Sequence, residues 1–413
     1  MRAEIINIGD ELLIGQVNNT NASWMAAELN KSGIQVVQIR SIADDEQAIQ
    51  KALDEASLRA DTILISGGLG PTKDDITKKT LADYFQSELV FHEPTFEQVQ
   101  KIFAARHFEV TEVNRQQALI PEKCTPLFNK NGTAPGMWFE KEGHVFVSMP
   151  GVPFEMKAMM SEQVIPRLSR QFQLGAIVHK TIMTTGMGES FLAAQIQEWE
   201  NNLPRYIKLA YLPQPGIVRL RLSAQGDNKE ILIQEMNQLV EGLKNYISES
   251  IFGFDDISLE EVVGELLVKK GKTISTAESC TGGYLAHLIS SIPGSSRYFK
   301  GSIVSYANEV KLSLLKVNPQ ILEQKGAVSC EVVEAMAIGA REQLKTDYSL
   351  AISGIAGPDG GTPEKPVGTV WIALADEDGV ISQAYHFGEH RGRNIRRSAL
   401  AALNMLRLRL GNK

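Results

Sequence analysis

The 413-residue chain has few cysteines and no long apolar run. Cys124, Cys280 and Cys330 are its only cysteines, and none belongs to a Cys-x-x-Cys pair. Their number and spacing argue against a disulfide framework and against a thiolate zinc site, and they fit a reducing compartment. No stretch approaches about 18 uninterrupted apolar residues, so neither a membrane span nor a membrane partner is predicted.

The sequence also shows no basic excess and no visible internal repeat, and its first residues argue against a signal peptide. Its 42 Lys and Arg residues stand against 49 Asp and Glu residues, a formal net charge of -7. Such a balance offers no general attraction to nucleic acid or to an anionic membrane surface. The segment 1–7 has an acid at its fourth position and no apolar core, so we expect a cytoplasmic protein. With 43% apolar residues, a chain of this length predicts two to four packed domains.

The N-terminal third alternates strand and helix patterns. Short apolar runs predict strands, and apolar residues at helical spacing predict the helices between them. This rhythm is typical of a parallel sheet with helices on its faces, whose ligands bind beyond the carboxyl ends of the strands. The predicted strands are 3–8, 34–39 and 62–65, the predicted helices are 22–31, 48–56 and 76–84, and the loop 66–75 follows the third strand.

Glycines and acids gather at these strand ends. Gly67, Gly68 and Gly70 can expose backbone amides to a phosphate group, and carboxylates suit a hard divalent cation. Together they suit a diphosphate ligand, whereas the alternative is a plain turn before a helix that favours Asp in its first turn. The candidate residues are Asp10, Glu11, Asp44, Gly67, Gly68, Gly70, Thr72, Asp74 and Asp75, with Asp10, Glu11, Asp74 and Asp75 as candidate metal ligands.

The pattern changes after about residue 172. Strand patterns at 177–185, 207–212 and 218–223, with helical patterns at 190–200 and 230–246, predict a small α+β domain. Two arginines on its half-exposed strand, Arg219 and Arg221, either contact nucleic acid or form an ordinary solvated face. A helix at 259–269 leads into a third unit. The predicted domains are therefore 1–172, 173–255 and 256–413.

The third unit contains the octet Thr276–Gly283. A strand pattern at 272–275 precedes it, and apolar residues at helical spacing follow it. Ser279 is thus expected on a strand-to-helix turn, where paired glycines and a helix N-terminus can present N–H groups to an oxyanion or a phosphate. The alternative is that Ser279 only caps the helix.

A nucleophilic serine needs a base, and Lys311 is the candidate. Strands at 303–306 and 350–353 should bring Lys311 and a glycine-rich loop to the same sheet edge as Ser279. Burial can lower a lysine pKa from about 10.4 to roughly 7–8, where the amine accepts a proton. A substrate phosphate should then bind away from Lys311, through arginine. The alternatives are His386 or His390 as base and Cys280 as nucleophile, although Cys280 is expected to be buried. Further predicted elements are a strand at 369–374 and helices at 331–344 and 395–408.

These motifs resemble those of the CinA family along essentially the whole chain. The resemblance implies an α/β fold of three domains: a three-layer MoaB/MogA-like domain with the molybdopterin-binding fold, a KH-type α+β domain, and a PncC-like nicotinamide-nucleotide amidohydrolase domain. The N-terminal motifs are Gly9–Leu12, Asn19–Asn21, Gly67–Asp75, Gly132–Gly136 and Pro150–Pro153. The C-terminal motifs are Ala277–Gly283, Val304–Asn308 with Lys311, and Ser353–Gly361 with Lys365–Thr369.

Residue by residue, the resemblance implies roles in the C-terminal domain. Ser279 takes the nucleophile position, Lys311 the base position and Tyr306 that of a strand-end tyrosine near the base. The amides around Thr281, Gly282 and Gly283 would form an oxyanion pocket. Two departures from the family pattern are Ala307, where a serine is usual, and an apparent insertion near the C-terminus that leaves two arginines open for the phosphate. The other implied substrate-binding residues are Gly354, Gly357, Arg391 and Arg393.

The resemblance also implies two activities in a homodimer. The C-terminal domain would deamidate nicotinamide mononucleotide to nicotinate mononucleotide and ammonia without a cofactor. The N-terminal domain would hydrolyse ADP-ribose to AMP and ribose 5-phosphate with Mg, Mn or Co. The alternative is a pterin- or nucleic-acid-binding protein linked to competence, in which only the C-terminal domain is catalytic. RNA-binding KH domains use a Gly-x-x-Gly loop, and residues 175–255 contain none, so nucleic acid is not an expected partner.

Overall fold

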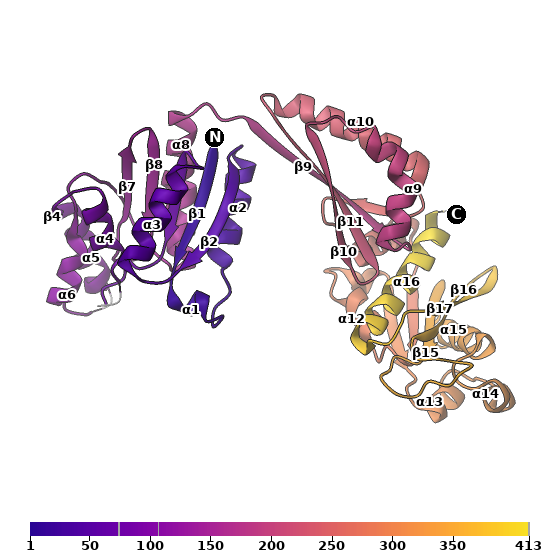
Figure 1. Ribbon diagram of the computed structural model, residues 1–413. Coiled ribbons are helices and arrows are strands. Elements are labelled where there is room, and N and C mark those ends of the chain that lie inside the picture. Colours follow the sequence, from indigo (N-terminus) through magenta and orange to yellow (C-terminus); the bar gives the residue numbers. More distant parts are fainter. Residues whose placement is uncertain (73–74, 106, 412–413) are drawn as a thin grey trace. The chain divides into compact units, whose positions relative to one another are not determined.

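The computed structural model describes residues 1–72, 75–105 and 107–411, which form two compact units (Figure 1). The first unit comprises Met1–Val178 and Ala224–Ile233, and the second comprises His179–Ser223 and Gln234–Lys413. Within the described residues, no helix combines the length and the apolar character needed to cross a membrane.

A six-stranded sheet forms the centre of the first unit, in the order β2-β1-β3-β8-β7-β6. The first four strands in this order are parallel, β7 pairs antiparallel with β8, and β6 pairs antiparallel with β7. β1 lies between β2 and β3, so the strand order changes direction at β1. The carboxyl end of β1 is therefore a topological switch point. The strands are β1 Arg2–Ile8, β2 Gln35–Ile42, β3 Thr62–Ser66, β6 Thr125–Leu127, β7 Gly136–Lys141 and β8 His144–Met149.

Helices cover both faces of this sheet, as the β-α-β pattern predicts. Successive strand side chains point to opposite faces, so Ile5 packs with Leu29 of α2 (Thr20–Lys31), while Ile6 packs with Leu53 of α3 (Glu46–Ser57). The remaining elements of the first unit, most of them not predicted from the sequence, are α1 Asp10–Leu13, α4 Thr77–Tyr84, β4 Leu89–Phe91, α5 Glu93–Ala105, α6 Glu112–Arg115, η1 Gln116–Ala118, β5 Leu119–Pro121, α7 Pro153–Met159, η2 Met160–Val164 and α8 Ile165–Gln171.

The middle domain is the predicted α+β unit. Its four strands pair in the order β10-β11-β9-β12, and two helices lie along one face of the sheet (Figure 1). The pairing of β12 with β9 shifts register between Ile251 and Gly253. The elements are β9 Ala176–Thr185, α9 Glu189–Asn201, β10 Ile207–Gln214, β11 Ile217–Gly226, α10 Lys229–Ile247 and β12 Ile251–Phe254.

The C-terminal domain has a five-stranded sheet in the order β14-β13-β15-β16-β17. The strands β14, β13 and β15 are parallel, so their carboxyl ends meet at one edge, and β13 is again a switch point between two neighbours. The elements are α11 Leu259–Lys270, β13 Ile274–Glu278, α12 Tyr284–Ser290, η3 Ser295–Arg297, β14 Phe299–Val304, α13 Asn308–Ser313, α14 Pro319–Lys325, α15 Cys330–Leu344, β15 Tyr348–Gly354, β16 Thr369–Asp376, β17 Gly379–His386 and α16 Arg391–Gly411.

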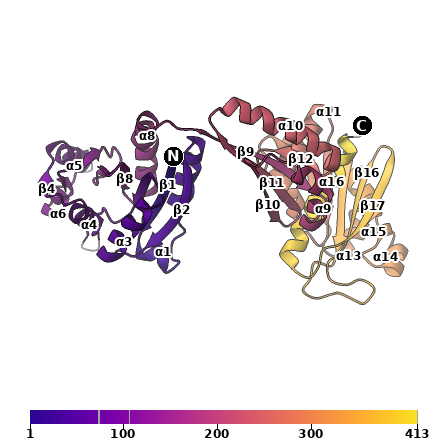
Figure 2. The same ribbon diagram turned by 45° about the horizontal axis from the view of Figure 1, so that its top comes forward.

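The middle and C-terminal domains share one hydrophobic core. Met183, Ile217 and Phe252 of the middle domain pack in the same cluster as residues of α11 and α16. The Arg407 guanidinium on α16 also donates a 3.2 Å hydrogen bond to the carbonyl of Ile251. Most of the middle domain therefore belongs to the same compact unit as the C-terminal domain, and α16, yellow in Figure 2, packs against both.

Two strand boundaries near the site differ from the sequence-based prediction. The strand expected at 272–275 is β13, which continues to Glu278 because it is paired on both sides throughout. The strand expected at 303–306 is β14, which ends at Val304, and Lys311 lies on the short helix α13 rather than on an extended exit. The edge strand β17 was not predicted.

Candidate active site

Ser279 is the first residue after β13. Its N–H donates a 2.9 Å hydrogen bond to the carbonyl of Ile352 in β15, and its carbonyl accepts a 3.1 Å hydrogen bond from Gly282. Gly282 and Gly283 have φ angles of 60° and 98°, in the left-handed region where glycine is unstrained. The paired glycines thus make the turn that holds Ser279 half-buried at the switch-point edge of the sheet.

The amine of Lys311 lies against Ser279. Its Nζ is 3.2 Å from Ser279 Oγ, 2.6 Å from the carbonyl oxygen of Ser305 and 3.4 Å from that of Tyr306. Only 1% of Lys311 is exposed. The chain segment that leaves β14 therefore supplies both the lysine and the two carbonyls that orient its amine.

The surroundings of Lys311 lower its pKa and so shift the amine toward its neutral form. Burial lowers the lysine pKa, while Cys280 and Glu309 nearby raise it by smaller amounts. No salt bridge involves Lys311 within the described residues. A neutral amine has two N–H groups and one lone pair. It can donate to the carbonyls of Ser305 and Tyr306 and still accept a hydrogen bond from the Ser279 hydroxyl.

Glu278, which sequence reasoning missed, organises the turn that follows it. Its fully buried carboxylate accepts hydrogen bonds from the backbone N–H groups of Gly283 and Leu285, both at 3.0 Å, and of Ala286 at 2.8 Å. These are the donors that the first turn of a helix leaves without a partner. No signal in the sequence indicated this role, because the predicted strand ended at residue 275 and Glu278 fell in the turn after it.

These bonds change the expected oxyanion pocket. The amide of Gly283 donates to Glu278, and that of Gly282 donates to the Ser279 carbonyl, so neither faces a ligand in this conformation. The amides of Cys280 and Thr281 donate to no other residue in the described part of the chain. They directly follow Ser279, as oxyanion donors commonly follow a nucleophile.

The alternative nucleophile and the alternative bases lie elsewhere. The side chain of Cys280 belongs to the hydrophobic core, and burial raises the pKa of its thiol to about 12. His386 is exposed on the edge strand β17. The ring of exposed His390 accepts a 3.2 Å hydrogen bond from the Arg393 amide at the start of α16. Across the described residues, neither histidine has a hydrogen bond to Ser279.

Tyr306 and Arg391 form the outer part of the site. Tyr306 is 61% exposed, and its hydroxyl accepts a 3.2 Å hydrogen bond from Arg391. The same guanidinium donates a 2.8 Å hydrogen bond to the carbonyl of Gly357. Tyr306 therefore touches Lys311 through its carbonyl and Arg391 through its side chain. Of the two candidate arginines, it is Arg391 that reaches the loops around Ser279.

The two candidate glycines at the end of β15 and in the loop after it have packing roles. A Cβ on Gly354 would lie 2.8 Å from the carbonyl oxygen of Thr369, and one on Gly357 would lie 3.0 Å from that of Glu389. Gly357 also has a φ angle of 88°. These close approaches explain the two glycines without a ligand, although the Gly357 carbonyl still orients Arg391.

Only some of the candidate ligand-binding residues of the N-terminal domain lie close together. The amide of Asp10 donates a 3.2 Å hydrogen bond to the Asp44 carboxylate, so these two strand ends meet. Burial raises the pKa of Asp44, the hydrogen bond from the Asp10 amide lowers it, and three acids nearby raise it further: Asp10, Glu11 and Asp75. Within the described residues, no group of three or more His, Cys, Asp or Glu side chains is arranged to hold a metal ion. Asp74 lies outside the described residues, so the described candidates alone do not form the expected metal site.

Hydrogen bonds within the glycine loop after β3 hold its conformation. The Asp75 carboxylate accepts hydrogen bonds from the amide of Gly70 at 2.8 Å and from the amide of Thr72 at 2.9 Å, and it also accepts one from the Thr72 hydroxyl. The amide of Gly67 donates to the Met149 carbonyl. The amides of Gly67 and Gly70 are thus already bonded, contrary to the expectation that they face a phosphate. Asp75 shapes the loop, as an Asp in a turn commonly does.

Three family models match the chain. "CinA C-terminal domain" matches residues 256–410, "Probable molybdopterin binding domain" matches residues 4–170, and "Damage-inducible protein CinA KH domain" matches residues 179–253. Ser279, Lys311 and Arg391 all lie within the first of these ranges.

Full-length relatives are similar across the same ranges. A CinA-like protein of Cytophaga hutchinsonii is 48% identical over 408 residues, 99% of this chain and 98% of its own length. One of Flavobacterium psychrophilum is 48% identical over 409 residues, 98% of each chain. A third, of Chloroherpeton thalassium, is 43% identical over 418 residues, 98% of this chain and 99% of its own. The similarity thus extends over both units.

Proposed function

Because the chain belongs to the CinA family, we propose that its C-terminal domain is an amidohydrolase that deamidates nicotinamide mononucleotide. The observation that carries the proposal is the 3.2 Å distance between Lys311 Nζ and Ser279 Oγ, with the lysine 1% exposed. A lysine amine that burial favours in its neutral form, beside a serine hydroxyl at a sheet switch point, is a base paired with a nucleophile.

In the first half of the reaction Ser279 is acylated. Its Oγ attacks the carboxamide carbon while the hydroxyl proton passes to the Lys311 amine. The carbonyl oxygen becomes negative, and the amides of Cys280 and Thr281 are its candidate donors. When the tetrahedral intermediate collapses, the C–N bond breaks and the Lys311 ammonium returns the proton to the leaving nitrogen. Ammonia departs, and the acyl group of nicotinate mononucleotide remains as an ester of Ser279.

In the second half water replaces the amine. The Lys311 amine, neutral again, accepts a proton from a water molecule whose oxygen attacks the ester carbon. Collapse breaks the C–O bond to Ser279, the hydroxyl regains its proton from Lys311, and nicotinate mononucleotide is released. Every proton passes between Ser279, Lys311, the substrate and water, so one base serves both halves.

Arg391 is the proposed phosphate anchor. A guanidinium binds phosphate oxygens through a fork of N–H groups. Arg391 forms no salt bridge with any described carboxylate, and its bonds to Tyr306 and Gly357 fix its position. A phosphate held there stays apart from Lys311. This matters because an anion beside the amine would raise its pKa and oppose the neutral form.

Release of ammonia from nicotinamide mononucleotide tests the proposal. Ser279→Ala should lose at least about 10³-fold in kcat, because no other nucleophile replaces the hydroxyl. Lys311→Met should lose a similar factor, since it keeps the side-chain bulk without the amine. A wild-type chain that releases no ammonia from this substrate, or a Ser279→Ala variant that is undiminished, would reject the mechanism.

A second candidate activity concerns the N-terminal domain. The carboxylates of Asp10, Glu11 and Asp75 lie close enough to raise the pKa of Asp44, and such a gathering of negative charge favours a cation, which a diphosphate ligand could bring with it. We infer that this domain hydrolyses ADP-ribose, and the rival is a pterin-binding module without that activity. The described residues alone do not form a metal site. Cleavage of ADP-ribose that is abolished by EDTA and restored by Mg, Mn or Co would support hydrolysis. Cleavage that resists EDTA, or tight binding of a pterin without cleavage, would oppose it.

A further inference from the structure

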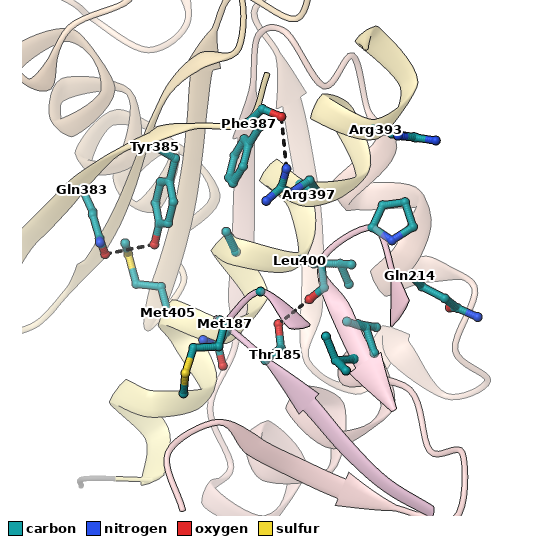
Figure 3. A pocket seen from close by; sticks show the side chains of 18 of the residues that line it. Thr185, Met187, Gln214, Gln383, Tyr385, Phe387, Arg393, Arg397, Leu400 and Met405 are labelled. Atoms are coloured by element: carbon teal, nitrogen blue, oxygen red, sulfur yellow. Dashed lines mark hydrogen bonds between the residues drawn. The ribbon is translucent and has the colours of Figure 1, made fainter. Parts of the chain in front are cut away.

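A groove of about 1020 Å³ lies where the middle domain meets the C-terminal domain within the second unit (Figure 3). The strand β17, the helix α16 and two loops of the middle domain form its walls. The shared hydrophobic core fixes these elements relative to one another. The volume is at the upper end of the roughly 300–1,000 Å³ typical of small-molecule sites.

The strand wall presents one face of β17. Gln383 and Tyr385, with Phe387 just beyond the strand end, are spaced by two residues and therefore point the same way, into the groove (Figure 3). The alternate residue Ser382 donates a 2.6 Å hydrogen bond to Glu334 of α15. The rings of Tyr385 and Phe387 are stacked, with centroids 5.3 Å apart and planes 18° apart. The face of β17 that lines the groove thus carries an aromatic pair, which is half-buried against the shared core.

The helix wall presents one face of α16. Arg393, Arg397, Leu400 and Asn404 recur at intervals of three or four residues, the spacing of one helix face. The Arg397 guanidinium lies 5.0 Å from the centroid of the Phe387 ring, and it donates a 3.1 Å hydrogen bond to the Phe387 carbonyl. Throughout the described residues, neither Arg393 nor Arg397 has a salt bridge to a carboxylate. Arg397 therefore stands beside the aromatic pair, and Arg393 lies one helical turn before it in the lining.

The loops of the middle domain close the third side. The turn between β10 and β11 approaches α16 so closely that a Cβ on Gly216 would lie 2.9 Å from Leu400 Cδ1. Met187 and Met405 add thioether groups to the lining. Glu189 is the one acidic residue in the lining, set against three arginines, of which Arg409 is held by Asp376 at 2.7 Å. The groove therefore combines a net positive charge with adaptable apolar surface.

We propose that this groove is a second ligand site, which binds a free nucleoside phosphate. The aromatic pair offers a surface on which a base can stack, and the two arginines offer donors to its phosphate. The site is separate from the one around Ser279. Arg391 and Arg393 are two residues apart, so on a helix they point about 200° apart, and Arg391 reaches Tyr306 while Arg393 lines the groove. The proposal does not depend on either hydrolytic activity.

Calorimetric titration of the full chain with AMP tests it. We expect wild-type binding that Tyr385→Ala weakens by about tenfold, the effect of losing one stacking surface. Tyr385→Phe keeps the ring and should bind within about threefold of the wild type. Arg397→Gln should weaken AMP by about tenfold while leaving adenosine, which lacks the phosphate, nearly unchanged. Thermal unfolding of each variant shows whether the fold is kept.

Matched variants separate this site from others. Tyr206→Ala removes an exposed tyrosine of the same unit outside the groove and should leave AMP binding unchanged. Arg391→Gln should also keep it. AMP binding that is lost in Arg391→Gln but kept in Tyr385→Ala would belong to the Ser279 site and overturn the proposal. The absence of wild-type binding at millimolar AMP, or binding of a single-stranded oligonucleotide without binding of AMP, would overturn it as well.

Discussion

The guanidinium of Arg391 donates a 3.2 Å hydrogen bond to the hydroxyl of Tyr306. This bond joins the start of α16 to the loop that follows β14, and the second bond of Arg391, to the Gly357 carbonyl, adds the loop after β15. One cation is thereby fixed above the edge where Ser279 lies. The two loops that hold it come from the two parallel neighbours of β13.

Replacement of Arg391 should act on substrate binding. Arg391→Gln should raise the KM for nicotinamide mononucleotide by about 10- to 100-fold with a smaller change in kcat, the effect expected of losing a hydrogen bond to a charged group. Arg393→Gln is the matched control. It should change KM less than about threefold, because no hydrogen bond to the substrate phosphate is lost. With nicotinamide riboside, which has no phosphate, wild type and Arg391→Gln should differ little. A large defect of Arg391→Gln on the riboside would assign Arg391 another role.

The lowered pKa of Lys311 predicts how activity depends on pH. The reaction needs the neutral amine, so kcat/KM should fall as pH drops below the pKa of Lys311 and reach a plateau above it. Burial places that pKa below the ordinary lysine value of 10.5. A profile of ammonia release from pH 5 to 10 measures it. A limb that appears only near the ordinary value would show that Lys311 is not desolvated in solution.

The same buried amine should make stability depend on pH. In the unfolded chain Lys311 binds a proton below about 10.5, whereas in the folded chain it loses that proton at a lower pH. Between these two pKa values the unfolded state binds more protons, so this residue makes the wild type more stable as pH rises, by at most about 1.4 kcal/mol per pH unit. Lys311→Met removes that dependence. The difference in Tm between Lys311→Met and the wild type should therefore fall from pH 7 to pH 10, and a constant difference would contradict the inference.

Cys280 should prove structural. Its thiol is buried in the core, and burial raises its pKa to about 12, so little thiolate exists at neutral pH. Cys280→Ala should keep kcat within about threefold and lose roughly 1–2 kcal/mol of unfolding free energy through the lost packing. Native wild-type protein treated with iodoacetamide should keep its activity. Inactivation that Cys280→Ala abolishes would make the thiol, rather than the Ser279 hydroxyl, the reactive group.

The sequence predicts much of this site because its main residues follow strand ends. A β-branched run before Thr276, glycines after Thr281 and a β-α rhythm suffice to place Ser279 at a sheet edge, and the strand before Lys311 leads to the same edge. The CinA-family motifs narrow the chemistry further. The proposed chemistry requires a buried Lys311, but the sequence alone does not show that burial, because it depends on how α13 packs.

Other features depend on tertiary contacts that no local pattern encodes. Glu278 reads locally as an ordinary acid in a turn, and only burial on both faces of β13 makes it a helix-organising group. The strand β17 was missed, and with it the aromatic pair Tyr385 and Phe387. The merging of the middle and C-terminal domains rests on a few apolar residues, such as Met183 and Ile217, that look like ordinary core residues in sequence.

Glu278 should be a positioning residue for Ser279. Its carboxylate accepts three backbone hydrogen bonds from the turn and helix that follow the nucleophile, at 2.8–3.0 Å. In Glu278→Gln one carboxylate oxygen becomes an NH₂ group, which faces N–H donors and cannot accept from them. We expect a loss of about 2–3 kcal/mol in unfolding free energy. We also expect kcat for ammonia release to fall at least about tenfold with little change in KM, because the hydroxyl moves relative to Lys311.

The comparison with Glu309→Gln distinguishes positioning from a general charge effect. Glu309 is an exposed acid on α13 near Lys311, and its charge also acts on the amine. Loss of that charge should lower the pKa of Lys311 slightly and shift the acid limb of the pH–rate profile to lower pH, with kcat at the plateau unchanged. Glu278→Gln should instead lower the plateau itself. If Glu278→Gln retains the wild-type plateau while losing stability, the carboxylate supports the fold alone and does not position Ser279.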